Sequence, residues 1–259
     1  MLLVANLSML FTELPLLQRL RAAAAAGFTA VEIQFPYEVP AVQLKEELER
    51  CGLELVLMNV PAGDLMSGGD GLACHPKRGV QFNNALDEAL AYALMVRPRQ
   101  VNILAGRLPA GVSRKSALTI LAANVREAAQ VFDRLGIQVL CEAINPIDMP
   151  RFLINTPEQL QELLVEVGHS NCFAQLDVYH MARQNISIEQ AMAVLGKSVA
   201  HVQFADHPGR GEPGSGTLDF RGVHAVLEQF NYQGAIAAEY KPAGATEDSL
   251  AWMYSAPFV

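Results

Sequence analysis

The sequence predicts a single-domain (β/α)8 TIM barrel over residues 1–259. Short apolar runs alternate with longer amphipathic segments along the whole chain. Several of the apolar runs are hydrophobic almost throughout, which is typical of parallel strands covered on both faces. No shift in composition divides the chain, and about 250 residues is a usual length for one such barrel. An open, doubly wound sheet is the alternative, but no glycine-rich phosphate-binding loop follows the first apolar run.

Eight segments have the composition of buried strands. They are residues 2–8, 30–35, 54–59, 100–105, 138–144, 172–178, 199–205 and 235–240. The segments between them carry apolar residues at the spacing of amphipathic helices, and Gly27 and Gly52 are placed to end two of them. The predicted helices are residues 15–26, 42–50, 81–95, 113–135, a helix that Thr156 caps, 188–195, 220–230 and 247–253. Strand and helix therefore alternate eight times, as a closed barrel requires.

Composition and charge exclude several classes of protein. The chain is 51% hydrophobic and 18% charged, as expected of a well-packed globule, and its net charge of −8 argues against nucleic acid as a partner. No apolar run is long enough to span a membrane, and the N-terminus has no basic segment of a signal peptide. The four cysteines show no CxxC spacing, so we expect reduced thiols in a cytoplasmic protein. The sequence leaves a homo-oligomer open.

Four predicted strands end in residues that could bind a metal ion. These residues are Glu142, Asp177, Gln203 and Glu239. Because the carboxyl ends of barrel strands meet at one mouth, we expect the four side chains to lie together. Their oxygen atoms suit Mg2+ or Mn2+ better than zinc. The alternative is a hydrogen-bonded polar cluster that closes the mouth of the barrel.

Three further residues are candidates for binding substrate. His180 follows Asp177 by three residues, where it could polarise a substrate oxygen. Arg210 and Lys241 are the cations best placed to meet an anionic substrate. The ordinary alternatives are a structural histidine, a surface arginine and a lysine paired with a neighbouring acid. Two long glycine-containing connections, residues 61–78 and 206–219, follow strand ends and are expected to act as lids or mobile insertions.

Two carboxylates beside a metal ion suit proton transfer between neighbouring carbons of a hydroxy-carbonyl compound. The metal ion stabilises the oxygens as they gain negative charge, and the two acids move the proton. This chemistry needs no organic cofactor.

The same residues resemble those of the hydroxypyruvate isomerase branch of the xylose isomerase-like barrels. The matching stretches are residues 5–11 (ANLSMLF), 35–37 (FPY), 61–64 (PAGD), 142–145 (EAIN) with Asp148 and Pro150, 177–181 (DVYHM), 201–203 (HVQ), 210–214 (RGEPG) and 239–242 (EYKP). They run nearly end to end and in order. The chain departs from the family at Ala143, where a proline is usual. At Gln203, many sugar-epimerase relatives have histidine, whereas the hydroxypyruvate isomerase branch has glutamine, as this chain does.

The resemblance implies that Glu142 and Glu239 are the acid and base, and that Glu142, Asp177, Gln203 and Glu239 hold the metal ion. It implies interconversion of hydroxypyruvate and 2-hydroxy-3-oxopropanoate, a small hydroxy-keto acid. We further expect Asn6 and Asp148, besides His180, Arg210 and Lys241, to contact this substrate. The alternatives are a 2-oxo-tetronate isomerase, a ketose 3-epimerase, an AP endonuclease and a sugar-acid binding barrel without activity.

Overall fold

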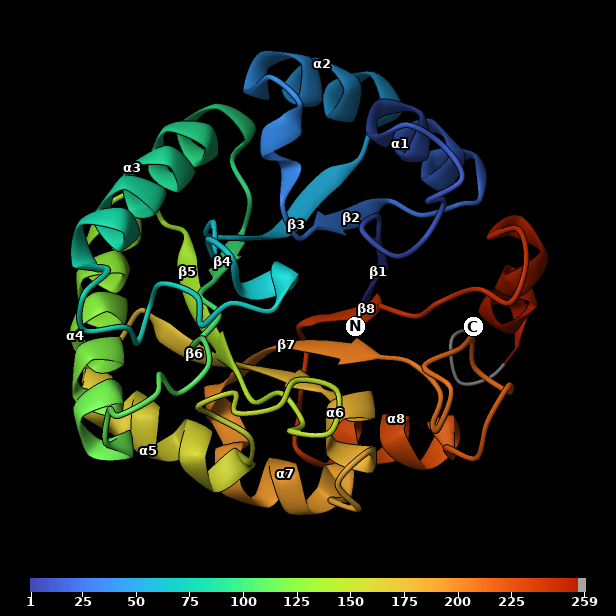
Figure 1. The fold of residues 1–259 in the computed structure, drawn as a ribbon. Helices are drawn as coiled ribbons and strands as arrows, with labels where there is room; N and C mark the ends of the chain where they lie inside the picture. The colour runs from blue at the N-terminus through green and yellow to red at the C-terminus, as the bar shows by residue number, and fades with distance from the viewer. Residues whose placement is uncertain (256–259) are drawn as a thin grey trace.

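The chain forms a closed barrel of eight parallel strands surrounded by helices, which confirms the predicted fold (Figure 1). In this computed structural model, the structure describes residues 1–255, so the end of the predicted domain at 256–259 lies outside the described residues. The strands are β1 (Leu2–Asn6), β2 (Ala30–Ile33), β3 (Glu54–Asn59), β4 (Gln100–Asn102), β5 (Gln138–Glu142), β6 (Cys172–Asp177), β7 (Val199–Phe204) and β8 (Ala235–Ala238). Each strand pairs with the next, and β8 pairs with β1 to close the barrel.

The helices lie outside the barrel, as Figure 1 shows. They are α1 (Leu16–Ala25), α2 (Ala41–Cys51), α3 (Gly79–Val96), α4 (Arg114–Asp133), α5 (Pro157–Val167), α6 (Val178–Ala182), α7 (Ile188–Leu195) and α8 (Phe220–Gln229). Short 3-10 helices are η1 (Pro36–Glu38), η2 (Leu65–Ser67), η3 (Gly196–Ser198) and η4 (Glu247–Tyr254). None of the described helices is long and apolar enough to cross a membrane.

The predicted elements differ from the structure in three respects. Most strands end one to three residues earlier than predicted, because residues such as Ile103 and Leu104 remain buried after the strand pairing has ended. The helix predicted at 247–253 is the 3-10 helix η4. Helix α6 was not predicted, and it begins because the Asp177 carboxylate accepts hydrogen bonds from the backbone of the next turn.

The inside of the barrel is apolar toward the N-terminal ends of the strands and polar toward their C-terminal ends. Small and branched side chains, among them Val4, Val56 and Leu140, form a separate apolar cluster. Buried polar side chains such as Glu32, Asn102 and Glu142 lie closer to the carboxyl ends. Burying so many polar groups is costly unless they bind one another or a ligand, so this end of the barrel is the place to look for chemistry.

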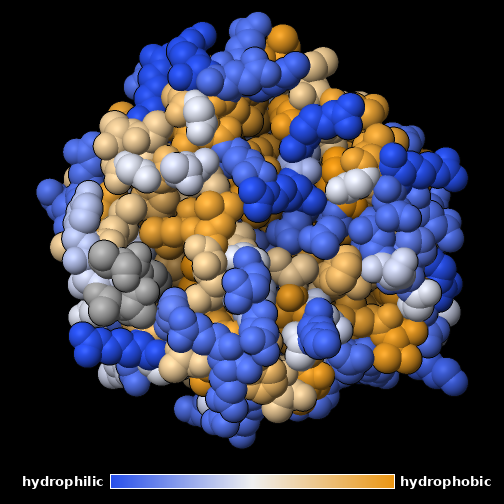
Figure 2. Space-filling view, turned by 180° about the vertical axis from the view of Figure 1, so that it is seen from behind, coloured by the Kyte–Doolittle hydropathy of each residue, from blue (hydrophilic) through white to orange (hydrophobic). Residues whose placement is uncertain are grey.

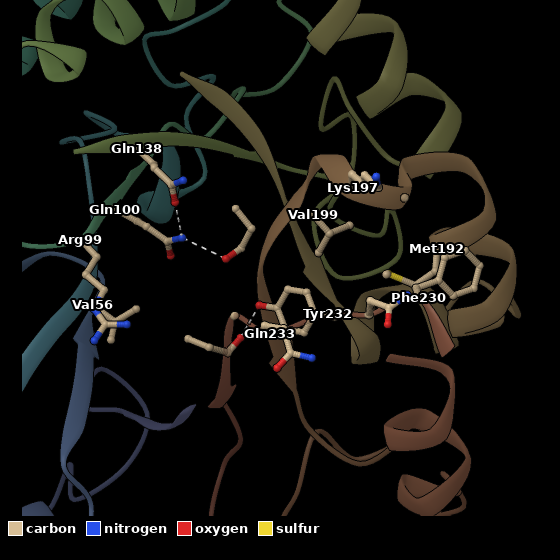
Figure 3. Close-up of a pocket in the computed structure, with 15 residues that line it drawn as sticks. Val56, Arg99, Gln100, Gln138, Met192, Lys197, Val199, Phe230, Tyr232 and Gln233 are labelled. Atoms are coloured by element: carbon tan, nitrogen blue, oxygen red, sulfur yellow. Dashed lines mark hydrogen bonds between the residues drawn. The ribbon is translucent and has the colours of Figure 1, made fainter. Parts of the chain in front are cut away.

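The opposite end of the barrel, at the amino ends of the strands, carries none of the predicted site residues. Figure 2 shows the molecule from this side, where hydrophobic surface lies between hydrophilic residues. A hollow of about 510 Å³ opens there, lined by Gln100, Gln138 and Tyr232 among others, and none of its lining residues is acidic (Figure 3). The Gln100 amide donates to Gln138 Oε1 and to the carbonyl oxygen of Ala200, both at 2.9 Å. These bonds join strands across the end of the barrel, which is a structural role.

Candidate active site

A small cavity lies at the carboxyl ends of the strands. Its volume of about 130 Å³ is below the roughly 300–1,000 Å³ of pockets that bind drug-sized ligands. The lining residues are Gln34, Phe35, Asn59, Met66, Asn102, Leu104, Glu142, Ile144, Asp148, Met149, Gln175, His180, Gln203, Arg210 and Glu239. The charged residues come from β5 and from the segments after β5, β6, β7 and β8, and apolar side chains complete the wall. Such a cavity suits a small polar molecule.

Glu142, Asp177 and His180 form the centre of this site. Their ligand atoms lie within 4.8 Å of one another, and all three residues are buried. Asp177 Oδ1 accepts hydrogen bonds from the backbone nitrogens of Tyr179 and His180, at 2.7 and 3.4 Å. Its other oxygen, Oδ2, is buried and has no hydrogen-bond partner among the described residues. A buried oxygen without a hydrogen bond calls for a cation or a donor nearby.

His180 is held in one orientation by Asn145. Asn145 Oδ1 accepts from the backbone nitrogens of Ile147 and Asp148, which turns the Asn145 Nδ2 group toward the ring. Asn145 Nδ2 lies 2.7 Å from His180 Nδ1, so Nδ1 is the acceptor and the proton of the neutral ring is on Nε2. Burial lowers the pKa of His180, which favours this neutral form.

Glu239 and Arg210 form the charged wall on the other side of the cavity. Arg210 lies 3.0 Å from the Glu239 carboxylate and 3.5 Å from Asp177 Oδ2. Gln34 Nε2 donates to the second Glu239 oxygen at 2.5 Å. The Arg210 guanidinium also lies over the ring of Tyr179, 5.1 Å from its centre, and its Nε is buried without an acceptor. Arg210 Nε is therefore a free donor that requires an acceptor group.

The two glutamates of the cavity hold their protons more tightly than an exposed carboxyl group. Burial, with the nearby Glu239 and Asp177 carboxylates, raises the pKa of Glu142 well above its ordinary value. Burial raises the pKa of Glu239 to about 8, although Arg210 opposes this shift. Burial alone would lower the pKa of Arg210, but the surrounding carboxylates raise it, so its charge is permanent.

Gln203 is oriented by a buried network around Glu32. Gln203 Nε2 and Asn6 Nδ2 each donate to Glu32 Oε1 at 2.7 Å, and His201 Nε2 lies 2.7 Å from Glu32 Oε2. Gln175 Nε2 donates to Gln203 Oε1 at 2.6 Å and to Glu142 Oε2 at 3.0 Å. These contacts fix the Gln203 amide with its oxygen toward Gln175 and its nitrogen toward Glu32.

Comparison with known proteins places this barrel in a family. The model of the family described as xylose isomerase-like TIM barrel matches residues 20–256. The chain belongs to the xylose isomerase-like TIM barrel family.

Relatives in this family match the chain over nearly its whole length. Hydroxypyruvate isomerase from Escherichia coli is 39% identical over 96% of both chains. The 2-oxo-tetronate isomerase from Pectobacterium atrosepticum is 38% identical and covers 96% of this chain and 95% of the relative. A crystal structure described as AP endonuclease, family 2, from Brucella melitensis has a TM-score of 0.93 at 36% identity, with 98% of each chain covered. The predicted resemblance is confirmed, and with it the prediction that the chain is an isomerase.

The xylose isomerase-like barrel brings most of the predicted site residues together. Glu142, Gln203, Glu239, His180 and Arg210 line one cavity, and Asp177 adjoins it. Of the predicted metal ligands, Glu142 and Asp177 lie within 4.8 Å of each other and of His180. Glu239 is instead turned toward Gln34 and Arg210.

Three further residues predicted to contact substrate do not all lie in the cavity, and the one that does is bound to protein groups. Asp148 lines the cavity, but its carboxylate accepts from Tyr179 Oη at 2.8 Å, from Asn145 and from Arg183. Asn6 is fully buried beside Glu32 and is not a lining residue. Lys241 is exposed and is likewise not a lining residue, which leaves Arg210 as the cation of the cavity.

The donor set of this family member fits a divalent cation. Two carboxylates, Glu142 and Asp177, lie together, and Asp177 Oδ2 is a buried oxygen without a hydrogen bond, with Arg210 3.5 Å away. His180 belongs to the same group, but its Nε2 carries the ring proton as long as Asn145 donates to Nδ1. Oxygen ligands of this kind are typical of hard cations.

Two residues of the site, Gln34 and Gln175, were not singled out from the sequence. Asn145 belongs to the matching stretch 142–145, and Glu32 is a polar residue within the predicted strand 30–35. Gln175 could have been found, because it lies two residues before Asp177 on the same strand and therefore on the same face. Gln34 gave no comparable signal, since its partner Glu239 lies 205 positions away in the chain.

Proposed function

We propose that this chain is an isomerase that moves a proton between the two neighbouring carbons of a small hydroxy-keto acid. The reaction interconverts hydroxypyruvate and 2-hydroxy-3-oxopropanoate, or isomerises the corresponding four-carbon acid, 2-oxo-tetronate. The proposal depends above all on one observation. Two buried carboxyl groups with raised pKa values, Glu142 and Glu239, face one small cavity beside a permanent cation.

Glu142 and Glu239 are the proposed acid and base. A group with a pKa of about 8 exchanges its proton readily near neutral pH, as Glu239 would. One carboxylate takes the proton from a carbon of the substrate, and a carboxyl group returns a proton to the neighbouring carbon. The hydroxyl proton moves from one substrate oxygen to the other as the two exchange the carbonyl and hydroxyl roles, so the reaction is balanced without an oxidant or a reductant.

The surrounding residues orient the substrate and keep water out. Arg210 is proposed to bind the substrate carboxylate through its unpaired Nε. His180 Nε2–H is proposed to donate to the oxygen that becomes negatively charged. The apolar wall of Phe35, Leu104 and Ile144 reduces contact with water, which strengthens both interactions.

A divalent cation, Mg2+ or Mn2+, is the proposed cofactor. Glu142 and Asp177 would hold it, together with the side-chain oxygen of Gln203, which lines the same cavity. Bound there, it supplies positive charge that stabilises the substrate oxygens when a carbon loses its proton.

An endonuclease activity is a weaker proposal, although a relative of known structure carries that description. The chain has a net charge of −8, whereas proteins that bind DNA neutralise phosphates with basic surfaces.

The test is an isomerase assay in D2O with the protein after treatment with EDTA and after addition of Mn2+. We expect conversion of at least one of the two acids, with one deuterium incorporated at the carbon that receives the proton, observed by NMR. Glu142→Gln and Glu239→Gln should each lower kcat by about 10^2- to 10^4-fold, because proton transfer loses its carrier. Glu158→Gln, on the exposed surface of α5, is the matched control and should keep full activity. Normal turnover in either active-site variant would refute the assignment.

A further inference from the structure

Asn59 and Asn102 are two buried amides of the cavity that the reaction described above does not use. Both residues line the cavity, and 4% of Asn59 and 1% of Asn102 is exposed. Asn102 Oδ1 is buried and has no hydrogen-bond partner. At Asn59, Tyr37 Oη donates to the backbone carbonyl oxygen at 2.6 Å, and the side-chain amide has no partner among residues 1–255. Native proteins leave few buried polar groups unpaired, so Asn102 Oδ1 calls for a donor, and the Asn59 amide beside it lines the same cavity.

The two amides lie side by side, across the barrel from the charged wall. Asn59 and Asn102 are direct partners in the pairing of β3 with β4. In the closed order of eight strands, β3 stands opposite β7, and β4 stands opposite β8. Asn59 therefore faces the strand of Gln203, and Asn102 faces the strand that Glu239 follows. A substrate that fills the cavity has one end near Arg210 and the other near the amide pair.

The chemistry of an amide determines which group it can satisfy. Each amide has an NH2 donor and a carbonyl acceptor. Turning the amide by 180° exchanges the two, so that the buried position would need an acceptor in place of a donor, and a hydroxyl group meets either requirement. A carboxylate only accepts hydrogen bonds and would leave the carbonyl oxygens without a donor. A hydroxyl group both donates and accepts, and therefore suits the pair.

We propose that Asn59 and Asn102 form a subsite for a terminal hydroxymethyl group of the substrate, and that the four-carbon 2-oxo-tetronate is preferred to hydroxypyruvate. This inference rests on the isomerase function proposed above. With the substrate carboxylate at Arg210 and the two reacting carbons between the glutamates, the fourth carbon and its hydroxyl extend toward β3 and β4. Hydroxypyruvate has no carbon at this position and leaves both amides unpaired. A site built to bind a hydroxyl discriminates strongly against the analogue that lacks it.

The test compares kcat/KM for the two acids, with Mn2+ present, in the unaltered protein and in two variants. Asn102→Leu keeps the size of the side chain and removes its polar atoms, and Asn59→Ala is a second variant should the first one fail to fold. We expect kcat/KM for the four-carbon acid to fall about ten- to a hundredfold in each folded variant. The value for hydroxypyruvate should change less than about threefold, because that substrate makes no contact with the amides. Asn83→Ala, on the exposed face of α3, is the matched control and should leave both values unchanged.

The outcomes separate the subsite from the function. Loss confined to the four-carbon acid supports the subsite. Equal losses for both acids, or a higher kcat/KM for hydroxypyruvate in the unaltered protein, overturn the subsite and leave the isomerase intact. Conversion of neither acid by the metal-loaded protein overturns the isomerase and, with it, the assigned role of the amides. Thermal unfolding of each variant shows whether a loss of rate comes from a loss of structure.

Discussion

Asn145 Nδ2 lies 2.7 Å from Nδ1 of His180, and this contact determines which ring nitrogen carries the proton. The other nitrogen, Nε2, lies 3.5 Å from Asp177 and 3.8 Å from Glu142. In the neutral ring, Nε2–H is therefore a donor pointed at the acidic centre of the site. A histidine in this state donates to an oxygen, whereas a metal ligand needs a free lone pair on that nitrogen.

Replacement of Asn145 should release this constraint. In Asn145→Ala, the His180 proton is free to move to Nδ1, so the donor that faces the substrate is lost for part of the time. We expect kcat to fall about tenfold, which equals about 1.4 kcal/mol of transition-state stabilisation. The loss of two backbone hydrogen bonds at Ile147 and Asp148 should lower stability by about 1–2 kcal/mol.

The decisive measurement is the 15N NMR spectrum of the ring nitrogens of His180. The unaltered protein should show a protonated Nε2, and the variant should show a mixture of the two tautomers. A variant that loses activity while its ring keeps the Nε2 proton would contradict this role for Asn145.

Proton binding at the glutamates should make the stability of the metal-free protein depend on pH. The folded-state pKa of Glu239 is about 8, above its ordinary value of 4.5, so the folded chain binds more protons than the unfolded chain between these values. Stability is then fully present below about pH 4.5 and is lost as pH rises through about 8. Each such proton changes stability by at most about 1.4 kcal/mol per pH unit.

Mn2+ should oppose this loss, because the cation binds the ionised carboxylates in competition with protons. The increase in Tm on adding Mn2+ is therefore expected to be larger at pH 8.5 than at pH 6. Calorimetry or thermal-shift measurements of the EDTA-treated protein would test this. Glu239→Gln, which has no proton to lose, should show a weaker decline of Tm with pH in the absence of metal. An equally steep decline in this variant would exclude Glu239 as a source of the effect.

Glu32 should act through the orientation of Gln203. Its carboxylate accepts from Asn6 and Gln203 on one oxygen and faces His201 on the other. In Glu32→Gln, one of these acceptors becomes an NH2 group opposite a donor, which is expected to cost about 2–3 kcal/mol in this buried network. If the amide of Gln203 turns in response, the affinity for Mn2+ should fall as well. Denaturant unfolding and titration with Mn2+ measure the two effects, and unchanged metal affinity would show that Gln203 is not a ligand.

Much of the fold and of the site follows from local patterns in the sequence. The apolar runs locate all eight strands, because strands covered on both faces are hydrophobic throughout. The strand-end residues Glu142, Gln203 and Glu239 could be placed in one cavity, since the carboxyl ends of barrel strands meet at one mouth.

The hydrogen-bond partners of these residues could not be derived in the same way. Gln34 reaches Glu239 across 205 positions of the chain, and Glu32 reaches Gln203 across 171. Neither pair leaves a pattern within a strand or a helix, since both depend on how the barrel closes. The exposure of Lys241 has a similar origin. Strand β8 ends at Ala238, so the alternation that would carry Lys241 to the face of Glu239 does not continue that far.

The connection from 206 to 219, expected to be a lid or a mobile insertion, is held in its conformation by hydrogen bonds to its own Asp206. The Asp206 carboxylate accepts from the backbone nitrogens of four residues of this loop, at 2.8–3.0 Å: His207, Gly214, Gly216 and Leu218. Arg210 belongs to the same loop, so the loop determines where the guanidinium lies. Gly216 is packed so closely that a Cβ atom there would lie 2.1 Å from the carbonyl oxygen of His207 and 2.6 Å from Asp206 Oδ1.

Gly216→Ala should therefore displace the loop and with it Arg210. We expect KM for the keto acid to rise about tenfold, and stability to fall by about 2–3 kcal/mol as hydrogen bonds to the buried carboxylate weaken. Gly209→Ala is the matched control, because nothing lies within 4 Å of a Cβ atom at that position of the same loop. Steady-state kinetics and thermal unfolding of the two variants provide the comparison. A normal KM in Gly216→Ala, or equal defects in both variants, would show that the loop does not position Arg210.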